Sequence, residues 1–260
     1  NKRRLEELAA EIQRRGIKKW WATQGRSDFI ADNPETMRKL RDAGLLMVLS
    51  GYESNEDDNL EHLLKRNTAD KNRAAAKICM DLGIISTGIF MVRPDFTEDD
   101  FDRLYASINK MGVAIPLITI LTPLPGTQLY KQREAELLTK DARFFDLLHA
   151  VLPTRIPRSL FYKKFAEANQ ATWKSFEKGT WTVIRNRPKF FLTHMRGVYK
   201  FLQKARNYGP ICEDAGSHLR DEIGIIPRDI TMANVDEWRA KRHSLNGSTP
   251  MGAGAQQVTA

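Results

Sequence analysis

Hydrophobic positions along the first 121 residues follow two alternating patterns. Apolar residues at helical spacing predict helices over residues 2–15, 33–43, 69–82 and 97–111. Strands are predicted at residues 17–23, 45–49, 84–92 and 113–121, and the continuous apolar run at 45–49 is typical of a parallel strand that is buried on both faces. Strands that alternate with amphipathic helices predict right-handed βαβ units and a parallel sheet.

The pattern changes after residue 127, where the strand signals stop. Helices are predicted over residues 127–151, 158–178 and 181–207, the last interrupted near Pro188, and Gly209-Pro210 should end the helical region. The tail from Leu245 is small and polar, which favours disorder. The predicted fold class is α/β, an incomplete (β/α) barrel of about four parallel strands followed by a mostly α-helical C-terminal domain. The domains are predicted at residues 1–130, 131–225 and 226–260, the last a tail that is disordered toward its end.

The start of the chain suggests a missing portion. A βαβ architecture normally opens on a strand, whereas the first predicted element here is a helix. No initiator Met is present. The expectation is therefore a piece of a longer protein.

Charge points to anionic partners. The sequence has 41 basic and 32 acidic residues, a net charge of +9. Such a balance favours nucleic acid or an anionic membrane surface, although a merely soluble basic protein fits equally well. No apolar run approaches 18 residues, so we expect a cytoplasmic protein, at most peripheral to the inner membrane. Two cysteines, Cys79 and Cys212, are too few for a disulfide scaffold or a thiolate metal site.

Polar and turn-forming residues follow each predicted strand. They occupy positions 24–28, 50–54, 93–95 and 121–127. Ligands of parallel α/β folds bind at the C-terminal ends of the strands. Any one of these segments alone could be a simple turn, but all four together predict a cofactor or substrate face.

Three of these segments resemble one enzyme family. Ser50-Gly51-Tyr52-Glu53-Ser54 with residues 64–68 resembles the G-x-E-S…L…N-K…T pattern of cobalamin-binding radical S-adenosylmethionine (SAM) enzymes. Residues 122–130 resemble the family's T-P-x-P-G-T-x-L-Y segment, and Arg26-Ser27-Asp28 resembles its R-x-D. Residues 51–58 and 88–97 are most similar to members that methylate hopanoid lipids at C-3. Val92-Arg93-Pro94 departs from the G-x-P of more typical relatives.

The resemblance implies cofactors and roles for residues. The family uses SAM, a [4Fe-4S] cluster and cobalamin to methylate unactivated carbons, and the cofactors carry the hard chemistry. Glu53 would contact ribose hydroxyls, and Lys65 would pair with the methionyl carboxylate. Arg26 and Asp28 would form a further polar contact. The remaining implied SAM-binding residues are Gly51 and Gly88, for close backbone approach, Ser54, and the turn with Thr122, Pro125 and Gly126. No catalytic residue is assigned.

The sequence also departs from the family. The C-x₃-C-x₂-C loop that holds the cluster is absent, as is the expected upstream cobalamin domain. The five histidines show no metal-ligand spacing, so no metal site is expected in this chain. We therefore expect a fragment or one part of a split enzyme that is inactive alone. The alternatives are another radical SAM reaction, such as cyclisation or methylthiolation, or a degenerate barrel that serves as a binding module.

Residues 178–212 form a basic and aromatic segment. It contains eight basic residues and no acidic one, interleaved with six aromatic residues. Such a segment suits an anionic bilayer or RNA. It also suits a helical lid with a solvated basic face. An anionic membrane surface is favoured over nucleic acid as the partner, alongside a hydrophobic lipid substrate.

Overall fold

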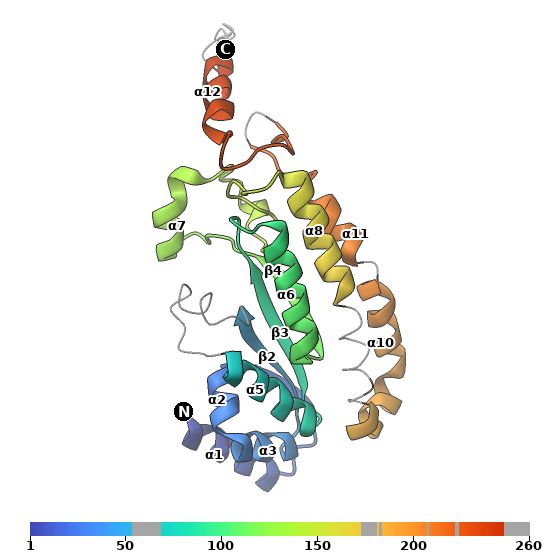
Figure 1. Ribbon diagram of the computed structural model, residues 1–260. Coiled ribbons are helices and arrows are strands. Elements are labelled where there is room, and N and C mark those ends of the chain that lie inside the picture. The colour runs from blue at the N-terminus through green and yellow to red at the C-terminus, as the bar shows by residue number, and fades with distance from the viewer. Residues whose placement is uncertain (54–68, 173–180, 182–183, 207, 222–223, 247–260) are drawn as a thin grey trace, which may run out of the picture.

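A four-stranded parallel sheet forms the centre of the computed structural model (Figure 1), which describes residues 1–53, 69–172, 181, 184–206, 208–221 and 224–246. The strands are β1 (Trp21–Gln24), β2 (Leu45–Glu53), β3 (Ile85–Val92) and β4 (Ile115–Ile120). They lie side by side in the order β1-β2-β3-β4, and each neighbouring pair is parallel. The predicted α/β fold with a parallel sheet is therefore confirmed.

The first strand begins later than the apolar run predicted. Residues 17–20 do not pair in the sheet, and pairing starts at Trp21, whose backbone N–H donates to Gly44 O at 3.2 Å. Lys18, Lys19 and Trp20 are exposed. Lys18 and Lys19 make this stretch polar, so it stays exposed as a connection between helix and sheet.

The helices that alternate with the strands match the predicted ones closely. They are α1 (Lys2–Arg14), α3 (Pro34–Asp42), α5 (Ala69–Asp81) and α6 (Glu98–Met111). A short helix that the pattern did not predict, α2 (Ser27–Asp32), follows β1. A capping box begins α6, because Thr97 Oγ1 accepts from Asp100 N and the Asp100 carboxylate accepts from Thr97 N. Gly112 ends α6 in the left-handed conformation.

The two faces of the sheet are covered differently. On β3, Ser86, Gly88, Phe90 and Val92 are buried. On the other side of the strand Ile85, Ile89 and Met91 are half-buried, although Thr87 among them is buried. On β4, Pro116, Ile118 and Ile120 are buried. Ile115 and Thr119, on the other side of the strand, are half-buried, and Leu117 between them is 39% exposed. The buried face packs on the helices. Among the described residues the other face, called here the inner face, is left partly open.

Residues 127–151 are mostly irregular, which corrects the predicted helix. Only α7 (Gln128–Arg133) and two short 3-10 turns, η1 (Glu134–Glu136) and η2 (Ala142–Phe144), form there. Asp141 accepts from Arg143 N, and Asp146 accepts from Leu148 N and His149 N. These local side-chain bonds compete with helical hydrogen bonds. Leu147 adopts a positive φ of 67°, which a helix does not allow.

The C-terminal part is helical, as predicted, but its boundaries differ. It contains α8 (Arg158–Ala171), α10 (Pro188–Arg206), α11 (Tyr208–Ala215) and α12 (Val235–Asn246). The interruption predicted near Pro188 is confirmed, since Arg187 is non-helical and Pro188 begins α10. Gly209-Pro210 does not end the helical region but starts α11. Proline is tolerated there because the first N–H groups of a helix need no internal acceptor.

Helices α8 and α11 pack against the core of the sheet. Phe161 on α8 meets Phe101 on α6 edge to face, with ring centroids 5.3 Å apart. Both belong to the main cluster of buried residues, together with Cys212 of α11. A second, smaller cluster joins residues 138–151 to residues 219–235. The predicted domain borders at 130 and 225 stay a prediction. No helix in the described ranges is both long enough and apolar enough to cross a bilayer.

Candidate cofactor-binding edge of the sheet

The four predicted polar segments lie at one edge of the sheet. Because all strands are parallel, their C-terminal ends share this edge (Figure 1). We call this edge the strand-end rim, formed in the described part of the chain by residues 24–28, 50–53, 93–95 and 121–127. The rim is the region that the sequence predicted as a cofactor face.

Arg26 and Asp28 form a bidentate ion pair at the end of β1. Arg26 Nε lies 3.0 Å from Asp28 Oδ1, and Nη2 lies 2.6 Å from Oδ2. Asp28 also accepts from the backbone N–H of Phe29 at 2.7 Å. The hydrogen bond from Arg26 lowers the pKa of Asp28 most, and the bond from Phe29 N lowers it further, so the carboxylate stays ionised. The pair therefore presents a fixed, half-exposed polar group beside the end of β2.

The end of β2 is tied to β1 and carries an irregularity. Ser50 Oγ donates to Gly25 O at 2.7 Å, and Gly51 pairs with Ile89 of β3. The register then shifts, so that Glu53 pairs with Phe90 and the strand carries one extra residue. Only the backbone of Glu53 is described. The predicted cofactor residues Ser54 and Lys65 lie outside the described residues.

Gly88 does not serve the role that the resemblance implied. It lies on the buried face, and a Cβ atom at this position would meet Tyr52 Cδ2 at 2.7 Å and Val113 Cγ1 at 3.0 Å. The missing side chain therefore makes room for core packing and not for a cofactor. Tyr52 stacks on Phe90 and bonds Ser86 Oγ at 3.1 Å. Burial raises the pKa of the Tyr52 phenol, so it stays neutral.

The segment after β4 forms a tight turn at the rim. Thr127 N donates to Leu124 O at 3.1 Å, with Pro125 and Gly126 between them. Gly126 has a φ of +86°, which a type II turn requires at its third position, and proline suits the second. Pro125 and Gly126 are exposed, whereas Thr122 is buried and bonds Ile120 O. The turn thus projects from the edge, and Thr122 holds its base.

A second ion pair stands at the end of β3. Arg93 Nε lies 3.0 Å from Asp95 Oδ1, and the guanidinium lies over the Phe96 ring at 5.9 Å. Pro94 O accepts from Arg155 N at 2.8 Å, which fixes the segment against the C-terminal part. The rim therefore carries two Arg–Asp pairs, one at each of the two strands that flank β2.

Thr87 is a candidate that the sequence analysis missed. It lies in the middle of the inner face, between Leu49 of β2 and Ile115 of β4 in register. Its hydroxyl is buried and has no hydrogen-bond partner among the described residues. A buried unpaired hydroxyl is costly unless a ligand or water satisfies it. The sequence did not single out Thr87, because it is one hydroxyl within a mostly apolar stretch.

The cysteines do not fit an iron–sulfur cluster. A cluster of this type needs several converging thiolates, but Cys79 and Cys212 are both fully buried. Burial raises the pKa of Cys79 to about 12, so it is a neutral core thiol. No group of three or more His, Cys, Asp or Glu side chains comes together in the described ranges. We therefore assign no cluster ligand to this chain.

Sequence comparisons place the chain among methyltransferases, although no family model matches it. It is 29% identical over 209 residues to hopanoid C-3 methylase from Methylococcus capsulatus, which covers 79% of this chain and 39% of that protein. It is 35% identical over 155 residues to bacteriochlorophyllide d C-8(2)-methyltransferase from Chlorobaculum tepidum, which covers 56% of this chain and 34% of that protein. The chain spans between a third and two fifths of the length of these relatives.

Solved structures were compared as well. The apo form of the cobalamin-dependent S-adenosylmethionine radical enzyme OxsB superposes with a TM-score of 0.48 and 13% identity, over 94% of this chain and 40% of that chain. The motif resemblance and the two curated relatives agree. The chain thus resembles cobalamin-binding radical SAM enzymes in three motifs and is similar in sequence to two curated methyltransferases over part of their length.

Proposed function

We propose that this chain is the C-terminal part of a cobalamin-dependent radical SAM methyltransferase that methylates a hopanoid lipid at C-3. The observation that carries the proposal is the extent of the match to hopanoid C-3 methylase, which covers 79% of the chain. A contiguous stretch of that size in a 260-residue chain includes α8 and most of α10. The match to the bacteriochlorophyllide enzyme covers 56%. The longer match favours a hopanoid over a bacteriochlorophyllide as the substrate class.

In this proposal the strand-end rim holds SAM. Thr87 would donate or accept one hydrogen bond on the inner face, and the Arg26–Asp28 pair would contact the polar end of the ligand. Glu53, Ser54 and Lys65 keep the roles that their motif implies. When bound in the complete protein, SAM, the cluster and methylcobalamin together supply hydrogen abstraction and a methyl group.

The isolated chain should be inactive. Neither cysteine is placed to hold a cluster, so cluster ligands would come from sequence outside this chain. The cobalamin site would likewise lie outside it. The chain's own contribution is then to position SAM and substrate and to exclude water.

The test is product analysis of the complete reading frame. The protein is purified anaerobically with its cluster and cobalamin, and incubated with a hopanoid and SAM that carries a deuterated methyl group. Mass spectrometry should find the labelled methyl group on the hopanoid. Cleavage of SAM without methyl transfer to any hopanoid would indicate another radical SAM reaction, such as cyclisation or methylthiolation, and would refute the substrate.

A variant on the inner face tests the SAM site itself. Thr87→Val removes the unpaired hydroxyl with little change of shape and should raise the KM for SAM by about tenfold, the value of a lost hydrogen bond. Lys163→Gln, which is exposed on α8, serves as the control. An unchanged KM in T87V would remove Thr87 from the site.

A further inference from the structure

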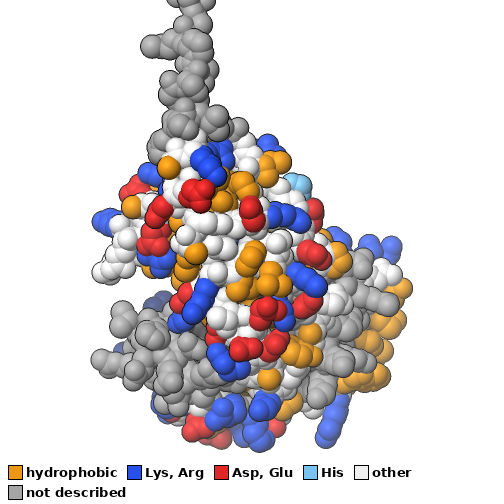
Figure 2. All heavy atoms as spheres, turned by 45° about the horizontal axis from the view of Figure 1, so that its top comes forward, with side chains coloured by type: hydrophobic (Ala, Val, Ile, Leu, Met, Phe, Trp, Pro, Cys, Tyr) orange, Lys and Arg blue, Asp and Glu red, His pale blue; other side chains and the backbone are white. Residues whose placement is uncertain are grey.

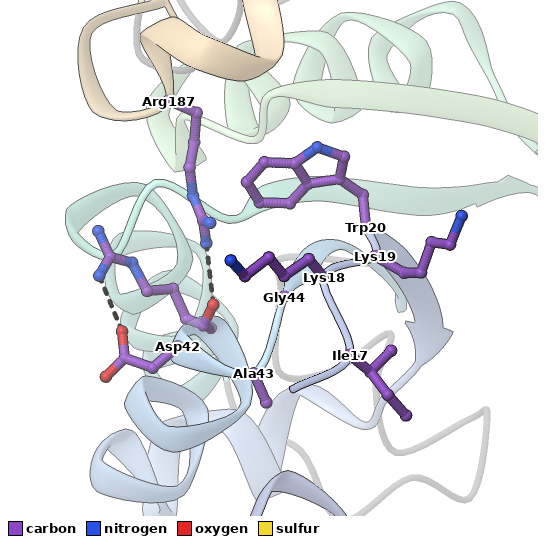
Figure 3. A pocket seen from close by; sticks show the side chains of 9 residues that line it. Ile17, Lys18, Lys19, Trp20, Asp42, Ala43, Gly44 and Arg187 are labelled. Atoms are coloured by element: carbon purple, nitrogen blue, oxygen red, sulfur yellow. Dashed lines mark hydrogen bonds and ion pairs between the residues drawn. The ribbon is translucent and has the colours of Figure 1, made fainter. Parts of the chain in front are cut away.

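A pocket lies at the end of the sheet opposite the strand-end rim. It has a volume of about 370 Å³ and lies between the connection before β1, the turn between α3 and β2, and Arg187 (Figure 3). We call it the basal pocket. Its lining includes Lys18, Trp20, Arg41, Asp42, Gly44 and Arg187.

The lining of the basal pocket carries excess positive charge. Four basic residues and one acidic residue line the pocket, and that acidic residue, Asp42, is already paired with Arg41 at 2.8 Å. Among the described residues, Lys18, Lys19 and Arg187 pair with no acidic group. Burial, and next the neighbouring Arg41, lower the pKa of Arg187. Two guanidinium groups held near each other without enough counter-charge favour an anion between or beside them.

Arg187 is held in place by contacts that do not use all of its hydrogen-bond donors. Its Nη2 donates to Leu45 O at 3.1 Å, and its guanidinium lies over the Trp20 ring at 5.1 Å. The Nε atoms of Arg187 and Arg41 are buried without a hydrogen-bond partner. In Figure 3 the side chain of Lys18 extends below Trp20 toward Arg187, whereas that of Lys19 extends away. The pocket is therefore preorganised for a ligand with several acceptor oxygens.

The backbone also shapes the pocket. Gly44 has a φ of +100°, and a Cβ atom there would lie 2.3 Å from Lys19 O. Only glycine allows this approach of the connection to the turn. Asn186, next to Arg187, donates to Met80 O at 3.4 Å, and Gly83 makes room for its side chain. The segment before α10 is thus fastened to the base of the sheet.

Helix α10 begins directly after Arg187 and presents an exposed apolar stripe. Leu192, Met195 and Tyr199, spaced three and four residues apart, are 71%, 55% and 59% exposed. Figure 2 shows hydrophobic side chains along the right-hand edge of the molecule, the side on which α10 lies in Figure 1. The exposed basic residues of the same helix are Lys189, Arg196, Lys200 and Lys204. An apolar stripe with basic flanks is the pattern of a helix that lies on an anionic bilayer.

We propose that the basal pocket binds the phosphate of an anionic phospholipid while α10 lies on the bilayer surface. The occupant is a lipid because the cationic pocket and the exposed apolar stripe adjoin through Arg187 and Pro188. Phosphate supplies acceptor oxygens for the N–H groups of the arginines and lysines. The site is separate from the strand-end rim, so its failure would leave the proposed function untouched.

Vesicle binding tests the proposal. The full chain is sedimented with phosphatidylglycerol vesicles and with phosphatidylcholine vesicles. Wild type should prefer the anionic vesicles, and Lys18→Gln should weaken binding by about fivefold. The control, Lys110→Gln, removes the same charge from an exposed position elsewhere and should weaken binding much less. Equal loss in both variants would show non-specific attraction and overturn the pocket.

A second pair of measurements identifies the source of the phosphate. Leu192→Ser with Met195→Ser should reduce vesicle binding and leave binding of inorganic pyrophosphate, measured by calorimetry, unchanged. Tight pyrophosphate binding by wild type without vesicle binding would assign the pocket to a soluble phosphate and overturn the lipid. Binding of single-stranded RNA in place of vesicles would also overturn it, as would binding of none of these probes.

Discussion

At the residue scale, arginines that are fixed by carbonyl oxygens or carboxylates determine how segments meet. Arg158 is fully buried, and its guanidinium donates to Gly216 O, Ile226 O and Pro227 O at 2.9 to 3.0 Å. Burial lowers the pKa of Arg158. A lone arginine at the start of a predicted helix gave no hint of this role, because its acceptors lie 58 to 69 residues away.

Arg158→Met should destabilise the fold by about 3 kcal/mol or more, because three buried carbonyl groups would lose their donors. Urea unfolding followed by circular dichroism measures the change. Lys163→Met on the exposed side of the same helix should stay within about 0.5 kcal/mol of wild type. Equal stability of R158M and wild type would show that the carbonyls find other partners.

The Arg26–Asp28 pair makes a prediction about pH. The pKa of Asp28 in the folded protein lies below the ordinary value of about 3.9. The pair therefore stabilises the fold above that value, and the stabilisation is lost as pH falls through the folded pKa. Arg26→Gln should raise the pKa of Asp28 toward its ordinary value, as followed by carboxyl NMR titration. Lys71→Gln should raise it less, since Lys71 acts only through its charge. A larger rise in K71Q would contradict this ranking.

At the scale of elements, the sequence predicted best where one periodicity held over a whole segment. Strands β2, β3 and β4 and their helices appear within a few residues of the predicted bounds. The helix predicted over residues 127–151 is wrong. The apolar residues there suit a helix, but Asp141 and Asp146 bind nearby backbone groups instead. At the rim, the motif located Arg26, Asp28 and the Pro125-Gly126 turn. It misassigned Gly88, because strand alternation and not the motif decides which face a residue lies on.

Gly88→Ala tests the packing role of this glycine. The added Cβ would press on Tyr52, Phe90 and Val113, so the fold should lose about 1–3 kcal/mol. Gly197→Ala in α10, where a Cβ meets nothing within 4 Å, should instead stabilise by up to about 1 kcal/mol. Thermal unfolding of both variants gives the comparison. If G88A lost SAM affinity in the complete protein without loss of stability, the cofactor role would be restored.

The cap of α6 offers a second test at this scale. Thr97→Ala removes the hydroxyl that accepts from Asp100 N and should cost about 1 kcal/mol of unfolding free energy. Thr97→Ser retains the hydroxyl and should cost much less. If serine were as harmful as alanine in chemical denaturation, the methyl group and not the cap would be responsible.

At the scale of the whole molecule, the C-terminal helices share one core with the sheet. Phe161 of α8 and Cys212 of α11 lie in the same cluster as the buried residues of β2, β3 and β4. Lys164 on α8 also lies 3.4 Å from Glu98 and 3.6 Å from Asp102 of α6. Such long-range contacts could not be read from local periodicity, which set the predicted border at residue 130.

Phe161→Ala should therefore weaken both parts together, by about 3–5 kcal/mol. Amide hydrogen exchange should speed up by a similar factor in β4 and in α11. Leu192→Ala, on the exposed stripe of α10, should change neither. Faster exchange confined to α8 and α11 would show two domains that fold independently, with a border near residue 130.

The most direct test of the central claim is the sequence of the complete reading frame that contains this chain. The account predicts a C-x₃-C-x₂-C segment ahead of Asn1, with a cobalamin-binding domain before it, because this chain has no thiolates placed to hold a cluster. A start site close to Asn1, with no such cysteines in the frame, would contradict a catalytic role as part of one polypeptide. The fold would then serve binding or act only with a partner chain.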